Sequence, residues 1–567
     1  MIVSAISLWK KYNLKNALNA SVWGEETKGD KAYCHVSYSG HKVSDGSVRI
    51  YARFGKPTGG VEKKPTVLLL PDAGATIDEE LMDYFIEKGY AVLMPDYSGK
   101  MKGDASGVMR TIYPESIAYG NLEKAKGLES EENFSPEEST WFEWTYTALY
   151  SVKYLKSRAD VGNIGVVGIR TGGEVAWQTM LSPDVKCGVP INAAGWRSFL
   201  NMAKFGDNLA HNLSDDRHRY IAAVEAQSYA PYVKCPVLML CALRDENFDC
   251  DRAYDTYSRI GNNEENALVY STDSGACIGP NALVDMDLFL EKNLKGREIY
   301  IPDTLNVTLV EAHDGLDINV TCDREGILEE AGVFYAEADV KTKSTYRDWR
   351  CIYKTVGRTV KNGKFTHKVK PFEGATAVFA YAYAKYINGF CVMSKITSKR
   401  LSAPNRAAVR SRVVFRGQDI DSFGVANYEE YSIGNIFLER EAVPKKAKGY
   451  GEITGVYSVG GFRTYKISSP RYLPLENALL EFDAYSKTSQ EIKVTIEMAD
   501  VERVSERFSC LADVKGGGKW KRIILRAADF KGETYGKPLE NFCDGSALVF
   551  SCAGEEEEYS ITNILWL

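Results

Sequence analysis

The sequence predicts a multidomain protein in which a doubly wound α/β domain precedes two β-sandwiches. Apolar strands alternate with helix-length segments from about residue 45 to 297, and short alternating strands replace them from about residue 303. The chain of 567 residues also exceeds what one hydrophobic core normally supports. We expect three domains, over residues 1–300, 301–402 and 403–567.

The α/β region is predicted to begin with an alternating strand over 47–54, after a lead-in segment without a clear period. The strand over 66–70 is apolar on both faces, as parallel strands covered by helices are. Further strands are expected over 90–94, 166–169, 185–192, 236–243 and 267–270, and helices over 77–88, 139–157, 251–260 and 282–294. Strand, helix and strand of these lengths form right-handed parallel units, so we expect one open, largely parallel sheet.

The remainder of the chain is predicted to be all β. Residues from about 303 to 400 show short strands separated by Pro and Gly, which is typical of a small sandwich of immunoglobulin type. The region from about 408 to 567 has the size of a jelly roll. Its expected strands are 479–485, 492–498, 520–525, 547–552 and 561–567.

Composition narrows the classes of partner. Lys and Arg number 70 against 76 Asp and Glu, so no basic surplus favours nucleic acid or an anionic membrane. No apolar run approaches the roughly 18 residues of a membrane span. The twelve cysteines are scattered without a Cys-x-x-Cys pair, and no signal peptide is evident, which favours reduced thiols in the cytoplasm. A leader removed ahead of residue 1 would make the protein secreted instead. We expect no metal and no cofactor.

One turn organises the α/β region. The strand that ends at Ile169 is followed by Arg170 and then by a helix-competent stretch that begins with Thr171. Gly168 and Gly172 flank the apex, where glycine lets the backbone fold sharply. The guanidinium of Arg170 has five donors, no acceptor and a charge that it keeps near neutral pH, so this side chain cannot act as a nucleophile.

This turn, the Tyr97-Ser98-Gly99 turn, the Trp-rich helix over 139–157 and the loop around Asp245 make residues 45–297 resemble an α/β-hydrolase. The similarity is to the acetyl-xylan-esterase and dienelactone-hydrolase-like group. It implies that the turn is a nucleophile elbow, Gly-x-Ser-x-Gly, and that the loop carrying Gly74 and Ala75 contributes to an oxyanion hole.

The resemblance also implies a triad in the order Ser, Asp, His. Asp245 matches the acid, but Arg170 occupies the nucleophile position. The histidine should lie in the loop after Tyr270, which contains Ala276 and Cys277 but no histidine. We therefore expect a catalytically degenerate, esterase-like protein that binds a small molecule or a carbohydrate.

Two alternatives remain open. Thr171 or Cys277 could replace the missing serine, which would make the chain an active carboxyl-ester or acetyl-ester hydrolase with a non-standard nucleophile. The other alternative is a structural or assembly protein.

Arg170 can have either of two roles. It can pair with Asp245, because a buried carboxylate that has lost its usual partners needs a cation. It can instead join the free N–H groups of the following helix in an anion site for a uronate or a phosphate. Both roles predict a binding site that contains Arg170, Thr171, Gly74, Ala75 and Asp245.

The C-terminal region resembles carbohydrate-binding modules of the galactose-binding jelly-roll type, on the segment 519–530 and the terminal segment 561–567. The resemblance implies that exposed aromatic rings stack on sugars. The alternation of these strands, however, favours core positions for Trp520 and Trp566.

Overall fold

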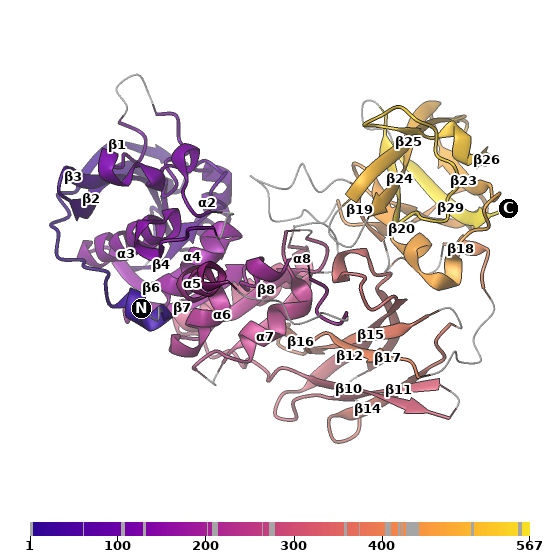
Figure 1. Cartoon of the computed structure of the whole chain (residues 1–567), viewed down its shortest axis with the longest axis horizontal. Coiled ribbons are helices and arrows are strands. Elements are labelled where there is room, and N and C mark those ends of the chain that lie inside the picture. Colours follow the sequence, from indigo (N-terminus) through magenta and orange to yellow (C-terminus); the bar gives the residue numbers. More distant parts are fainter. Residues whose placement is uncertain are drawn as a thin grey trace.

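The computed structural model describes residues 4–60, 62–103, 108–128, 132–200, 202–206, 214–245, 247–262, 265–271, 278–313, 315–356, 360–372, 375–402, 410–417, 420, 423–426, 442–499, 504–553 and 558–567. An α/β region forms one lobe, and all-antiparallel sheets follow it (Figure 1). This arrangement confirms the predicted fold class. In the described part of the chain, no helix combines the length and the apolar character needed to cross a bilayer.

The α/β region is built on a nine-stranded sheet. In spatial order, the first three pairings between strands are antiparallel. The other five pairings, which join the last six strands, are parallel. In spatial order the strands are β1 (Ser21–Lys28), β2 (Lys31–Val43), β3 (Gly46–Pro57), β5 (Ala91–Pro95), β4 (Lys64–Leu70), β6 (Val161–Ile169), β7 (Val185–Ile191), β8 (Leu238–Ala242) and β9 (Ala267–Ser271). The carboxyl ends of β4, β6, β7 and β8 therefore meet along one edge.

Helices cover this sheet, and their ends carry recognisable caps. They are α1 (Ala5–Trp9), α2 (Glu79–Ile86), α3 (Thr140–Ser157), α4 (Thr171–Thr179), α5 (Asp215–Val224), α6 (Ala226–Tyr229), α7 (Ala253–Tyr257) and α8 (Pro280–Lys295). The Ser139 hydroxyl accepts the N–H of Phe142 and caps α3. Proline begins α8, and Gly296, at φ 72°, ends it.

The lead-in segment, in which the sequence shows no clear period, has regular structure. It contains β1 and β2, which extend the sheet as an antiparallel hairpin. β1 is an edge strand whose side chains are almost all exposed. The apolar alternation that marks a half-buried strand is therefore missing from its sequence.

The middle region contains two antiparallel sheets. One consists of β10 (Asn306–Ala312), β11 (Gly315–Thr321) and β14 (Lys364–Val369). The other consists of β13 (Arg350–Val356), β12 (Leu328–Ala338), β15 (Ala377–Tyr386) and β16 (Cys391–Met393), with β17 (Thr397–Arg400) paired to β15.

The C-terminal region also contains two antiparallel sheets. The first holds β20 (Lys445–Lys448), β21 (Thr454–Tyr457), β29 (Tyr559–Trp566), β23 (Leu480–Ser486) and β26 (Lys519–Leu525), with β18 (Val413–Phe415) on β29. The second holds β19 (Phe423–Val425), β22 (Phe462–Thr464), β28 (Ala547–Cys552), β24 (Gln490–Ala499), β25 (Val504–Val514) and β27 (Lys531–Gly532).

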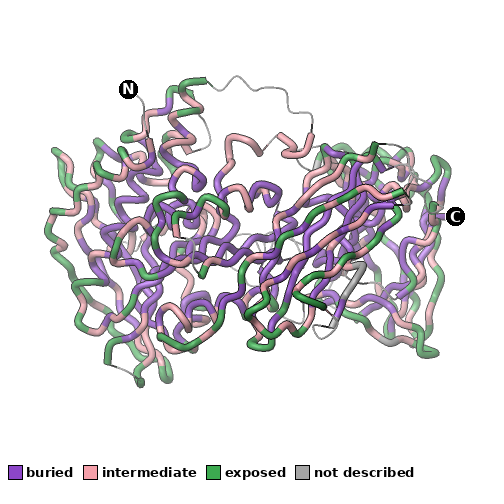
Figure 2. Tube along the Cα trace, turned by 90° about the horizontal axis from the view of Figure 1, so that it is seen from below, coloured by how far each residue is buried: buried purple, intermediate pink, exposed green. Residues whose placement is uncertain are grey.

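The first two regions share one hydrophobic core, which runs from Ala5 to Ile396. A separate core holds the C-terminal sheets. Buried segments accordingly occupy the interior of the molecule, and exposed segments lie at its periphery (Figure 2). The domain limits at 300/301 and 402/403 stay predictions, but the first of them does not separate two cores.

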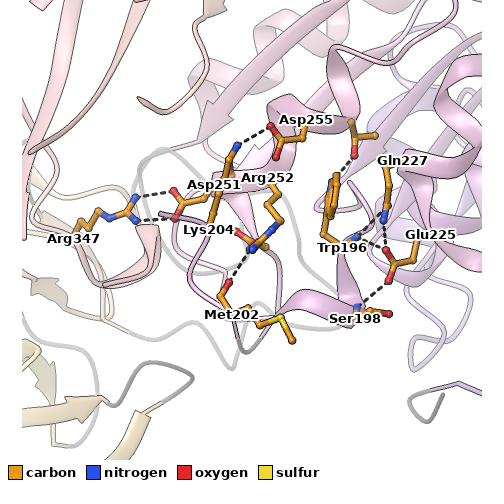
Figure 3. Close-up of polar contacts among 12 residues, drawn as sticks. Trp196, Ser198, Met202, Lys204, Glu225, Gln227, Asp251, Arg252, Asp255 and Arg347 are labelled. Carbon is orange, nitrogen blue, oxygen red and sulfur yellow. Dashed lines mark hydrogen bonds and ion pairs between the residues drawn. The ribbon is translucent and has the colours of Figure 1, made fainter. Parts of the chain in front are cut away.

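A buried ion pair joins the middle region to the α/β region. Arg347, just before β13, donates from Nη1 and Nη2 to the two carboxylate oxygens of Asp251 at 2.7 and 2.8 Å (Figure 3). Arg244, after β8, donates to the backbone carbonyls of Thr345 and Arg347. The loop after β8 is therefore held by the middle region.

Candidate functional site

A cavity of about 540 Å³ opens at the carboxyl ends of the parallel strands, where open α/β sheets bind their ligands. Its wall comes from the loop after β4, the turn after β6 and the loops after β7 and β8. The lining residues are Asp72, Ala73, Gly74, Leu122, Leu128, Arg170, Thr171, Glu174, Asn192, Gly195, Arg197, Leu200, Tyr220, Asp245, Asn247 and Phe248.

The turn after β6 has the strained geometry that its glycines indicate. Arg170, at its apex, has φ 50° and ψ −113°, a conformation that L side chains rarely adopt. Its N–H donates to Ile191 O at 2.8 Å, and its carbonyl accepts the N–H of Glu174 at 2.9 Å. A Cβ on Gly172 would lie 2.2 Å from Leu70 O, so the close approach of helix and strand requires glycine at this position.

Two carboxylates hold the side chain of Arg170. Its Nε lies 3.5 Å from Asp245 Oδ2, and its Nη1 lies 3.8 Å from Asp72 Oδ2. The Asp245 side chain is 2% exposed and also accepts from Asn192 Nδ2 at 3.1 Å and from the N–H of Asn247 at 2.9 Å. The predicted pairing of Arg170 with Asp245 is therefore present, and Asp72 joins it.

The loop after β4 faces the hydroxyl of Thr171. Thr171 Oγ1 donates to Asp72 Oδ1 at 2.5 Å and accepts the N–H of Ala73 at 2.6 Å. An N–H group in this loop is therefore bonded to a side chain of the turn itself. Gly74 lines the cavity, whereas Ala75 donates its N–H to Asp72 O at 2.9 Å and is not among the lining residues.

Glu174, which the sequence analysis did not select, is buried at the cavity wall. Its Oε1 accepts the N–H of Gly195 at 2.9 Å, and its Oε2 has no hydrogen-bond partner in the described part of the chain. Burial raises the pKa of its carboxyl group to about 7, aided by the charge of Glu225 and opposed by that of Arg197. Its place in the first turn of α4, directly after the elbow, was the available signal.

Arg197 enters the cavity from the segment after β7. Trp196, at φ 63°, turns this segment, and Glu225 accepts the N–H groups of Trp196 and Ser198 at 3.1 and 2.9 Å (Figure 3). The guanidinium of Arg197 lies 5.5 Å from the ring centre of Trp141. This segment has no clear periodicity, so no sequence signal could place Arg197 in the site.

Two other predicted positions, Ala276 and Cys277, lie outside the described residues. The carboxylates of Asp249 and Asp251, after β8, pair with Arg252 and Arg347. Among the described residues, no group of three or more His, Cys, Asp or Glu side chains is placed to hold a metal ion.

The two C-terminal tryptophans have different environments. Trp566 is buried and packs on Phe542 with 5.3 Å between ring centres, as strand alternation predicts. Trp520 is half-buried and covers Gly449, where a Cβ would lie 2.4 Å from the indole. A cavity of about 380 Å³ lies on the same sheet and is lined by Ala447, Tyr457, Tyr485, Lys487, Thr488, Glu558 and Ser560.

Solved structures with similar folds include two acetyl xylan esterases. The enzyme from Paenibacillus sp. R4 has 16% identity and a TM-score of 0.39, over 51% of this chain and 92% of its own. Acetyl xylan esterase 1 from Thermoanaerobacterium sp. JW/SL YS485 has 14% identity and a TM-score of 0.40, over 51% and 93%. Est1E from Butyrivibrio proteoclasticus has 15% identity and a TM-score of 0.30, over 46% and 98%.

No curated protein matches the chain significantly. Residues 50–271 match the model of the Dienelactone hydrolase family. This segment includes β4 to β9 and the turn at Arg170. The chain therefore contains an α/β-hydrolase-like domain that is similar to the Dienelactone hydrolase family over residues 50–271.

Proposed function

We propose that the hydrolase domain is catalytically degenerate and binds a small polar ligand without cleaving esters. The observation that carries this proposal is the position of Arg170 at the apex of the elbow, between Asp245 and Asp72. A guanidinium keeps its proton near neutral pH and has no lone pair available for attack on a carbonyl carbon.

The other parts of an ester-hydrolase site support the same proposal. Residues 271–279 contain no histidine to act as general base. The Ala73 N–H, which faces the elbow, already donates to Thr171 Oγ1 and is not free for an oxyanion. Because each member of a hydrolytic triad accounts for orders of magnitude in rate, loss of both nucleophile and base leaves little turnover.

The charges around the cavity support an uncharged, polyhydroxylated ligand rather than a uronate or a phosphate. Two guanidinium groups, of Arg170 and Arg197, face three carboxyl groups, of Asp72, Glu174 and Asp245. The cavity therefore has no excess of positive charge to attract an anion. Hydroxyl groups of a neutral sugar can donate to Glu174 Oε2 and accept from the guanidinium groups.

Ester hydrolysis by Thr171 is a second candidate, favoured by one contact. Its hydroxyl donates to the Asp72 carboxylate at 2.5 Å, within reach of proton transfer. In this candidate the oxyanion of the transition state would form beside the loop after β4. The Ala73 N–H of that loop is already bonded to the Thr171 hydroxyl.

Hydrolysis of 4-nitrophenyl acetate separates the two candidates. We expect the wild-type rate to equal that of buffer, and Thr171→Ala and Cys277→Ala to change nothing. Turnover that Thr171→Ala or Cys277→Ala removes would establish an active enzyme with a non-standard nucleophile.

Calorimetric titration then tests the ligand class, with D-glucose, D-xylose, D-glucuronate and inorganic phosphate as probes. We expect the neutral sugars to bind and Glu174→Ala to weaken them about tenfold, as loss of a hydrogen bond to a charged group does. Glu115→Ala, at an exposed side chain outside the cavity, is the matched control. Binding of glucuronate or phosphate alone would restore the anion-site role of Arg170.

We also propose that the C-terminal region binds carbohydrate on its β20-β21-β29-β23-β26 sheet. Support comes from the cavity that Tyr457 and Tyr485 line, because tyrosine rings offer an apolar face and a polar tip to a sugar. Retention on a polysaccharide affinity gel should fall in Tyr485→Ala and persist in Tyr535→Ala, whose ring is 77% exposed elsewhere. Equal retention of both variants would contradict this site.

The cysteines that the structure describes are free thiols, which supports the proposal of a reducing, cytoplasmic location.

A further inference from the structure

A second cavity, of about 700 Å³, lies where the three regions meet. The hydrolase domain contributes β9 and the first half of α8. The middle region contributes β12, β15 and β16, and the C-terminal region contributes β19 and residues 443–444. Figure 1 shows α8 at the centre of the molecule, between these parts. None of the residues that line it lines the cavity at Arg170.

Asp285 of α8 is a buried carboxyl group in the wall of this cavity. The residue is 1% exposed, and its Oδ1 accepts the N–H of Cys391 at 2.6 Å. Its Oδ2 has no hydrogen-bond partner among the described residues. A buried polar atom without a partner is costly to a fold, so its retention calls for an occupant of the cavity.

Burial also raises the pKa of the Asp285 carboxyl group well above its usual range, although the N–H of Cys391 and the charge of Lys385 oppose that shift. Burial therefore favours the protonated form of this acid. Since Oδ1 accepts from Cys391, the proton of that form belongs on Oδ2. In this form Asp285 offers the cavity a hydrogen-bond donor.

The polar groups beside Asp285 satisfy one another. The Tyr383 hydroxyl donates to Glu330 Oε1 at 2.5 Å, and Lys385 Nζ lies 3.2 Å from Glu329 Oε2. These contacts involve β12 and β15 at the rim. Tyr383 and Lys385 therefore already contact these two glutamates of β12 at the rim.

The apolar part of the wall comes from all three regions. Its members are Val269, Val284, Phe334, Met393, Ile420, Phe423 and Val443. The Phe334 ring stacks on Tyr381 with 4.9 Å between ring centres, which fixes its orientation. Polar residues, Ser271 and Asn281 among them, also line the cavity. Apolar and aromatic side chains with a small number of polar groups are the usual composition of a small-molecule site.

We propose that this cavity binds an uncharged, ring-containing small molecule that accepts a hydrogen bond from Asp285 through a carbonyl oxygen. The ring packs on Phe334 and the aliphatic wall, and the carbonyl lies at Asp285 Oδ2. Because each region supplies part of the wall, the occupant stabilises their mutual arrangement. This site is independent of the function proposed for the cavity at Arg170.

The test uses the full chain and two probes of equal ring size, coumarin with its carbonyl and naphthalene without it. Saturation-transfer difference NMR reports binding of each. We expect coumarin to bind at least about fivefold more tightly than naphthalene, the contribution of one directed hydrogen bond. Equal binding of the two probes, or no coumarin signal, overturns the proposal.

Four variants locate the binding. Asp285→Asn keeps a donor of the same shape and should retain coumarin, whereas Asp285→Leu should weaken it about tenfold. Val284→Trp fills the cavity from a position that is 38% exposed and should abolish binding. Val310→Trp, at a 51% exposed position on β10, is the matched control and should bind as wild type.

If Asp285→Leu does not fold, the Val284→Trp and Val310→Trp pair decides the outcome. Coumarin binding that survives Val284→Trp would place the probe elsewhere and overturn the proposal.

Discussion

Arg170 Nε lies 3.5 Å from Asp245 Oδ2, so the cation at the elbow is held by a buried carboxylate from the loop after β8. The same guanidinium reaches Asp72 at 3.8 Å. One side chain thereby compensates two carboxylates at the floor of the cavity. This relationship accounts for how the fold keeps the buried charge of Asp245 compensated.

Replacing Arg170 should therefore destabilise the domain without restoring activity. Arg170→Ser leaves Asp245 buried and unpaired, and we expect a loss of about 3 kcal/mol in the free energy of unfolding, the lower end for broken buried pairs. Adding Asp245→Asn should recover part of this loss. Urea denaturation measures both, with Arg297→Ser at the surface as control. Esterase activity in Arg170→Ser would contradict the degenerate site.

Glu174 should make stability fall as the pH rises. Its pKa is raised from 4.5 to about 7, so between these values the folded state binds more protons than the unfolded state. The free energy of unfolding should drop by about 3 kcal/mol across that window, and Glu174→Gln should remove this part of the drop. Urea titrations at pH 5 and pH 8 test it. Parallel profiles of wild type and Glu174→Gln would refute the raised pKa.

The Arg347–Asp251 pair should couple the middle region to the hydrolase domain. Arg347→Met strands a buried carboxylate and should cost about 3 to 5 kcal/mol. Arg347→Lys should also destabilise the protein, because lysine cannot reproduce the two parallel hydrogen bonds. Thermal melts measure the loss. If Arg347→Lys melted like wild type, the two-point geometry would be unimportant.

Gly172 of the elbow and Gly74 of the cavity wall should differ sharply in their tolerance of a Cβ. A Cβ on Gly172 would lie 2.2 Å from Leu70 O and 2.3 Å from Pro71 O, so Gly172→Ala should prevent the elbow from packing. Gly74 has no atom within 4 Å of the corresponding position, and Gly74→Ala should fold normally. Soluble yield and near-ultraviolet circular dichroism distinguish them. Normal folding of Gly172→Ala would argue against the close approach of α4 and β4.

Sequence pattern alone determined the parallel strands of the α/β region and the position of the sharp turn after β6. Buried parallel strands leave continuous apolar runs such as Val67 to Leu70, and the sharp turn demands Gly168 and Gly172, so both signals are local. The missing histidine was likewise visible, because absence of a residue type from a loop needs no coordinates. β1 escaped detection since an exposed edge strand has no apolar period.

Only the tertiary structure decided which side chains share a site. Thr171 and Asp72 are 99 positions apart and meet because β4 and β6 are neighbours in the sheet. Asp285 and Cys391 are 106 positions apart and meet because the middle region packs against α8. Strand order and domain packing result from the burial of whole surfaces, a collective property that the spacing of individual residues does not encode.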